Sequence, residues 1–137
     1  MNAPAPISAA ALSPAALARI ETVRSIAREV AGPNAVAVDR DGRFPHEVIG
    51  ALKAECLLSA HVPERFGGFG AGIAELGLMC EALGQRCASS AMVFAMHQVQ
   101  MACLVRHGST PFFEDYLREA VQKQLLIASV TSEQGVG

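Results

Sequence analysis

The stretch at residues 87–108, CASSAMVFAMHQVQMACLVRHG, decides the fold that this sequence predicts. It contains no Asp, Glu or Lys, and its single Arg lies close to its end. A hydroxyl of Ser89 or Ser90 can accept from the free N–H groups of a first helical turn, and Gly108 can end a helix in the left-handed conformation. Apolar side chains cover almost the whole circumference in between, and a helix that is apolar all round is buried. The stretch therefore predicts a buried central helix over residues 89–107, wrapped by other helices.

A membrane-spanning helix is the alternative for such a stretch. About 20 predominantly apolar residues are needed to cross a bilayer, but the continuous apolar pieces here are only residues 91–96 and 101–105. The interrupting polar side chains are Ser89, Ser90, His97, Gln98 and Gln100. Because polar groups are costly to bury in lipid, we expect a protein core and no membrane partner.

The composition of the 137 residues predicts one helical domain. Hydrophobic residues make up 51%, while tryptophan is absent and aromatic residues are scarce, which suits a core of Ala, Leu, Val and Met. The net charge of −2 gives no electrostatic footprint for nucleic acid. The four cysteines show no C-x-x-C spacing and no clustered histidines, which argues against a metal site. We expect them to be buried and reduced in a cytoplasmic protein.

Capping signals and hydrophobic periodicity predict four further helices. Ser13-Pro14 is a helix start, because a capping hydroxyl precedes a proline whose missing N–H would be unpaired there. Gly32-Pro33 is expected to break or kink this helix. Pro45 opens a second helix, a third stops at Gly84, and Thr110-Pro111 starts the last. Their inward faces are predicted to be Leu17, Ile20, Val23, Ala27 and Val30; Val48, Ile49, Leu52 and Cys56; Ile73, Leu76, Met79, Cys80 and Leu83; and Phe112, Phe113, Tyr116, Leu117, Ala120 and Val121.

Two features that could carry chemistry have simpler structural interpretations. The glycine-rich loop at residues 57–72 lacks the preceding strand and the G-x-G-x-x-G spacing of a dinucleotide-binding loop. Its glycines are better explained as a tight turn between two helices. His97 and His107 lie ten residues apart on one helix, point in different directions and cannot share a metal. We expect His97 to be buried and hydrogen-bonded, or to border a cavity.

The pattern changes at the end of the chain. Residues 125–130, LLIASV, are apolar and rich enough in β-branched residues to predict a strand. A strand without a partner is not stable alone. We therefore expect a flexible lead-in over residues 1–12, a helical domain over residues 13–124, and the truncated start of a β-domain over residues 125–137. The predicted fold class is an all-α orthogonal or up-down bundle of about five helices that ends in the first strand of a missing β-domain.

Several motifs, taken in order, resemble the N-terminal domain of the acyl-CoA dehydrogenase family. Phe44-Pro45, Leu57-Leu58 and VPERFGGFG at residues 62–70 are similar to the family pattern FP…GLL…VPE.YGG.G. The similarity continues through Glu81-Ala82-Leu83-Gly84, the serine-rich start of the long helix, His107-Gly108 and Tyr116-Leu117. Residues 128–137, ASVTSEQGVG, resemble the segment A.TEPGAGSD that opens the family's middle β-domain. Three positions depart from the pattern: Ser132 replaces Thr, Gln134 replaces Pro, and Cys56 stands where Gly is common.

The resemblance implies a flavin-dependent oxidoreductase of fatty acid metabolism. In the complete enzyme, a carboxylate base would take the α proton of an acyl-CoA thioester, the β hydride would pass to N5 of FAD, and an electron-transfer flavoprotein would accept the electrons. The resemblance assigns flavin contacts to Ser129, Thr131, Ser132 and Gly137, and the acyl pocket to Met92, Ala95 and Met96. Methionine suits an adaptable apolar cavity, although core packing explains these positions equally well, and Met101 is expected to be core. The catalytic base and a tetramer interface are expected beyond Gly137.

Two alternatives stay open at this point. One is a non-enzymatic helical module, derived from such an enzyme, that uses an exposed apolar face to bind a partner. The other is a relative on the same fold that oxidises nitroalkanes or acts as a flavin monooxygenase. The isolated chain is expected not to hold FAD, because it would retain only one wall of the flavin pocket.

Overall fold

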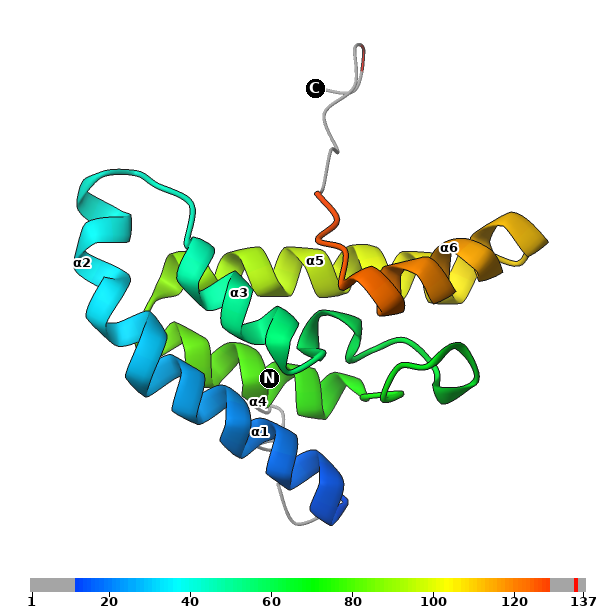
Figure 1. Ribbon diagram of the computed structural model, residues 1–137, viewed down its shortest axis with the longest axis horizontal. Helices are drawn as coiled ribbons and strands as arrows, with labels where there is room; N and C mark the ends of the chain where they lie inside the picture. The colour runs from blue at the N-terminus through cyan, green and yellow to red at the C-terminus, as the bar shows by residue number, and fades with distance from the viewer. Residues whose placement is uncertain (1–11, 129–134, 136–137) are drawn as a thin grey trace, which may run out of the picture.

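The computed structural model describes residues 12–128 and Gly135, and all the regular structure in that part of the chain is helical. In Figure 1, α5 runs across the molecule with α4 alongside it, α1 crosses α4, and α6 lies at the C-terminal end of α5. The bounds are α1 Pro14–Ile26, α2 Gly32–Arg40, α3 His46–Ala54, α4 Ile73–Gly84, α5 Ala88–His107 and α6 Pro111–Lys123. Because α1 and α2 form one continuous run, the predicted all-α bundle of about five helices is confirmed.

The first helix starts as predicted but does not break at Gly32-Pro33. The hydroxyl of Ser13 accepts from the N–H of Ala16 at 3.1 Å, and Pro14 takes the first helical position. A π-helical turn, Ala27–Ala31, joins α1 directly to α2, which places Pro33 in the first turn of α2. The wider π turn relieves the clash that a proline ring makes with the preceding turn. The chain therefore stays helical to Arg40.

Four residues predicted to face inward are exposed instead. Leu17 is 42% exposed because the buried stripe of α1 runs through Ala16 and Ile20. Ile73 and Phe112 are 84% and 70% exposed because each lies in the first turn of its helix, where neighbouring elements no longer cover it. Cys56 lies beyond the end of α3 with φ of 56°, so the helical period no longer applies to it. Cys103 is exposed as well, which corrects the expectation that all four cysteines are buried.

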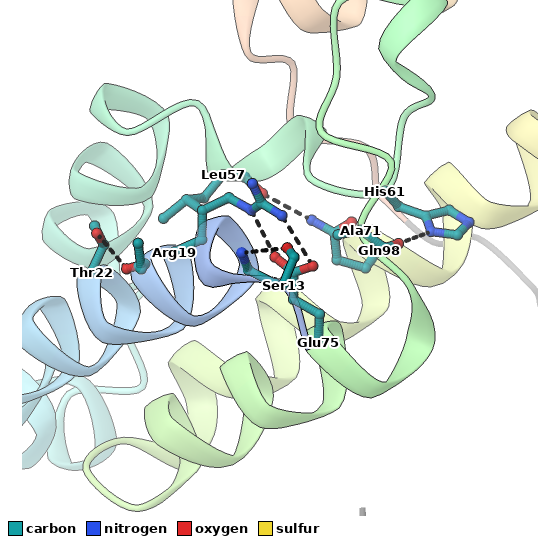
Figure 2. Close-up of polar contacts among 10 residues, drawn as sticks. Ser13, Arg19, Thr22, Leu57, His61, Ala71, Glu75 and Gln98 are labelled. Carbon is teal, nitrogen blue, oxygen red and sulfur yellow. Dashed lines mark hydrogen bonds and ion pairs between the residues drawn. The ribbon is translucent and has the colours of Figure 1, made fainter. Parts of the chain in front are cut away.

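The glycine-rich loop is a tight turn, as predicted. Gly67 has φ of +92°, and a Cβ added at Gly68 would lie only 2.1 Å from the carbonyl oxygen of Val62. The loop lies beside a half-buried ion pair, in which Arg19 Nε of α1 lies 2.7 Å from Glu75 Oε1 of α4 (Figure 2). The Arg19 guanidinium also lies 4.9 Å from the centre of the Phe69 ring. These contacts hold the loop against both helices.

The two ends of α5 differ from the prediction. Its N-cap is Cys87, in an extended conformation and without a side-chain capping bond, so the expected serine cap is wrong. Ser90 instead lies inside the helix and is fully buried. Gly108 has φ of −79° and is not left-handed. Glycine is required there for another reason, since a Cβ would lie 2.5 Å from the Leu104 carbonyl oxygen and 2.8 Å from Cβ of Phe113.

The expected strand at the end of the chain is not formed over residues 125–128. A strand needs a partner strand for its hydrogen bonds, and the described residues contain none. The rest of the predicted strand, residues 129–130, lies outside the described residues.

Candidate functional site

Helix α5 has one buried face and one open face. Ser90, His97 and Gln98 are at most 4% exposed, alongside the core residues Phe94 and Met101. On the opposite side the exposed apolar residues are Met92, Met96 and Val99, at 62%, 38% and 51%. As predicted, other helices pack against α5, but among the described residues they cover one of its faces and leave the other open. The helices and turns described here cover only the face that carries the polar residues. Met101 is core, as predicted.

By length and composition, α5 alone among the described helices could cross a membrane. Its polar side chains are nevertheless directed into the protein. Gln98 Nε2 donates to the carbonyl oxygens of Leu57 and Leu58 at 3.2 and 3.1 Å, and Figure 2 shows Gln98 reaching toward Leu57. Such bonds within the chain are expected for the core helix of a folded domain.

His97 connects two segments through its two ring nitrogens. Nε2 lies 2.7 Å from the carbonyl oxygen of Leu58, which can only accept, so Nε2 donates. The N–H of Ile127 donates to Nδ1 at 3.1 Å. Burial lowers the pKa of His97, the bond to Leu58 opposes that shift, and the nearby Lys53 adds to it. The ring is therefore held neutral with its proton on Nε2. The prediction of a buried, hydrogen-bonded histidine is confirmed.

Gln124, at the end of α6, binds the turn at Leu57–Ser59, which His97 and Gln98 also bind. Its φ is 46°, a conformation that is unfavourable without glycine. Its side chain accepts from the Leu58 N–H at 3.2 Å and donates to the Ser59 hydroxyl and the Val121 carbonyl, both at 2.8 Å. These bonds fix the point from which residues 125–128 leave the helices. The sequence reasoning missed the roles of Gln98 and Gln124, because an isolated glutamine in a helical pattern gives no signal of its partners.

Two apolar grooves flank residues 125–128. The methionine groove, about 440 Å³, is lined by Phe44, Met92, Val93, Met96, Leu126, Ile127 and Ala128. The aromatic groove, about 410 Å³, is lined by Gln100, Cys103, Leu104, His107, Gly108, Phe112, Phe113, Tyr116 and Ile127. Ile127 is thus the wall that the two grooves share. Its backbone N–H is the group that His97 holds.

The structure brings together only part of the predicted site. Met92 and Met96 line the methionine groove, as their spacing of four places them on one face of α5. Ala95 instead lines a third cavity, about 190 Å³, together with Val99 and Gln98. The predicted flavin contacts, Ser129, Thr131, Ser132 and Gly137, lie outside the described residues. Within residues 12–128 no cluster of side chains could hold a metal ion.

The lining of the methionine groove suits an apolar group. All seven of its lining residues are apolar, whereas a flavin ring system needs placed polar groups to fix its orientation. No carboxylate of the described residues lines either groove. The methionine groove can therefore contact an apolar group, but its lining side chains supply neither a base nor the polar groups that would orient a flavin.

Comparison with known proteins decides the family. The model of the family described as "Acyl-CoA dehydrogenase, N-terminal domain" matches residues 13–124. The chain belongs to the acyl-CoA dehydrogenase family. This acyl-CoA dehydrogenase family member spans about 30% of the length of the curated relatives that it matches.

Three of those relatives carry the names of CoA-thioester dehydrogenases. The "Probable acyl-CoA dehydrogenase fadE25" of Mycobacterium leprae is 28% identical over 85% of this chain and 30% of its own length. The cyclohexane-1-carbonyl-CoA dehydrogenase of Geobacter metallireducens is 33% identical over 85% of this chain and 31% of its own. The cyclohex-1-ene-1-carbonyl-CoA dehydrogenase of Syntrophus aciditrophicus is 30% identical over 86% and 29%. The names of these three relatives are those of oxidoreductases that act on CoA thioesters.

Proposed function

We propose that this chain is the N-terminal helical part of an FAD-dependent enzyme that dehydrogenates an acyl-CoA thioester at its α and β carbons. The observation that carries the proposal is the family match over residues 13–124. The names of the relatives support it, since they are dehydrogenases of CoA thioesters, two of them with cyclic acyl groups.

In this proposal the methionine groove takes the acyl group. Met92 and Met96 supply flexible, polarizable side chains that adapt to an apolar ligand, and residues 126–128 form the opposite wall. In the reaction, these residues bury the acyl group and exclude water from it. When bound, FAD supplies the hydride acceptor, and the protein supplies position and electrostatics. We assign the flavin contacts to Ser129, Thr131, Ser132 and Gly137.

The remaining parts of the proposal concern the assembled enzyme. Because no described carboxylate lines the methionine groove, we place the catalytic base outside residues 12–128. We further propose that residues 125–137 begin the middle β-domain, that an electron-transfer flavoprotein accepts the electrons, and that the enzyme is a cytoplasmic homotetramer. The 137-residue chain alone is then inactive and does not retain FAD.

The proposal is tested by measuring the intact mass and the visible spectrum of the polypeptide as its source cell produces it. We expect a mass well above 14.4 kDa, a flavin spectrum with one FAD per chain, and anaerobic bleaching of the flavin by an acyl-CoA. A colourless polypeptide of 14.4 kDa that associates with another protein would instead support the helical-module alternative.

A matched pair of variants tests the acyl groove in that enzyme. Met96→Phe adds bulk inside the methionine groove, whereas Val99→Phe adds the same kind of bulk at the third cavity. We expect Met96→Phe to lower kcat/KM for a long-chain acyl-CoA by about 10- to 100-fold, the scale of steric discrimination in an apolar pocket. Short-chain substrates and the Val99→Phe enzyme should be affected far less. Equal losses in the two variants would place the acyl group elsewhere.

A further inference from the structure

The segment that leaves the helical domain is attached to α5 through one side chain. The backbone N–H of Ile127 donates to Nδ1 of His97 at 3.1 Å, and the opposite ring nitrogen donates to the Leu58 carbonyl at 2.7 Å. Ile127 lies thirty positions from His97 along the chain. Its side chain is also the wall common to the methionine groove and the aromatic groove.

We propose that His97 is the positioning residue that fixes Ile127 between the two grooves and so sets the direction in which the chain leaves the helical domain. The anchor itself rests only on the geometry of residues 58, 97 and 127. Its importance for an acyl group rests on the proposed function, because Ile127 then forms one wall of the acyl site.

The neutral Nε2–H tautomer is essential to this role. One ring nitrogen must donate to a carbonyl and the other must accept from an N–H, and only the neutral ring with its proton on Nε2 offers both. A second proton would place two donors, Nδ1–H and the Ile127 N–H, against each other. The anchor therefore holds while the ring is neutral and is lost when the ring is protonated.

The surrounding charges favour the neutral ring. Lys53 of α3 is the charged group that acts on His97, and it disfavours a second positive charge. Residues 57–59 and 125–128 contain no ionisable side chain. Glu75 is paired with Arg19 and Lys123 with Glu119, while Glu55 at the end of α3 is exposed and is not among the groups that shift the pKa of His97. No described carboxylate is therefore placed to stabilise an imidazolium at this position.

Gln98 offers a matched control, because its described hydrogen bonds go to the same turn and not to Ile127. Its Nε2 donates to the Leu57 and Leu58 carbonyls. Gln98→Met removes those bonds at nearly constant volume, and His97→Ala removes the bond to Ile127 as well as one bond to Leu58. His97→Gln keeps one donor and one acceptor at the end of the side chain, so it is the conservative rescue.

The experiment is hydrogen exchange of the Ile127 amide in the 137-residue protein, followed by NMR. We expect exchange to be roughly 3- to 10-fold faster in His97→Ala, the effect of losing one hydrogen bond. Exchange should change less than about twofold in Gln98→Met and should be partly restored in His97→Gln. Equal acceleration in His97→Ala and Gln98→Met, or no change in His97→Ala, would overturn the proposal.

A measurement on the unmodified protein tests the same anchor without any substitution. Imidazole 15N spectra should show a protonated Nε2 and an unprotonated Nδ1 for His97, and a proton on Nδ1 at neutral pH would overturn the proposal. Both experiments are made without flavin or acyl-CoA. Failure of the proposed function would appear in the flavin spectrum and leave these results unchanged, whereas failure of the anchor would appear only here.

Discussion

The two faces of α5 both depart from those of an ordinary amphipathic helix, because polar side chains are buried on one face among core residues and apolar side chains are exposed on the other. The face packed against α4 and residues 57–59 carries Ser90, His97 and Gln98, all buried, while the face beside the methionine groove exposes Met92 and Met96. The polar side chains can be buried because backbone groups of residues 57, 58 and 127 form hydrogen bonds with most of their polar atoms. The difference teaches that the inner face specifies where other segments lie, whereas the outer face is free to meet an apolar group.

The largest expected effect comes from removing an apolar side chain from each face. Phe94 is fully buried, so Phe94→Ala should lower the free energy of unfolding by about 3–5 kcal/mol, through lost burial and a residual cavity. Met92 is 62% exposed two residues away, so Met92→Ala should cost less than about 0.5 kcal/mol. Urea denaturation of the two variants measures this contrast. Similar losses in both would mean that the outer face is covered in solution.

The helices could be predicted from local signals, but the faces could not. The Ser13 cap and the stop at Gly84 depend on residues within one or two turns, so capping and periodicity sufficed. The covering of α5 depends on what packs against it from elsewhere in the chain, and Leu58 and His97 are 39 positions apart. Met92 and Met96 could be placed on one face because they lie four residues apart on one helix. Ile127 could not be recognised as a wall shared by two grooves because it lies thirty positions from His97.

The second expected effect comes from removing the hydrogen bonds by which Gln124 binds the turn at residues 57–59. Gln124→Gly relieves an unfavourable positive φ but removes three hydrogen bonds, two of them buried. Because the Leu58 N–H then loses its partner inside the protein, we expect a net loss of about 1–3 kcal/mol in the free energy of unfolding. Thermal or urea unfolding measures it. An increase in stability would mean that the backbone conformation outweighs the bonds.

The third effect is a dependence of the free energy of unfolding on pH, which arises from His97 on the buried face of α5. Burial lowers the pKa of His97 in the folded protein, while in the unfolded chain it has the ordinary value near 6.5. Between the lowered pKa and about pH 6.5 the unfolded state binds more protons, so stability rises with pH there. We expect stability to be full above about pH 6.5 and to fall as the pH drops below it.

The matched control for this pH dependence is His97→Gln, measured by urea denaturation across the same pH range. The other three histidines are present in both proteins, so the difference between the two profiles isolates His97. The profile of His97→Gln should be flatter than that of the unmodified protein below about pH 6.5. Parallel profiles would show that His97 keeps its ordinary pKa in the folded state.

The smallest effect has the opposite sign and concerns the residue just before the turn that α5 holds. Cys56, like Gln124, has a positive φ, but it is exposed, and no hydrogen bond or ring contact of its side chain offsets the strain. Glycine adopts this conformation without a Cβ penalty, so Cys56→Gly should raise the free energy of unfolding by about 0.4–1 kcal/mol. Cys56→Ala, which removes the thiol and keeps the Cβ, is the control and should leave stability nearly unchanged. If both substitutions stabilised the protein equally, the thiol and not the backbone conformation would be the source of the strain at the start of this turn.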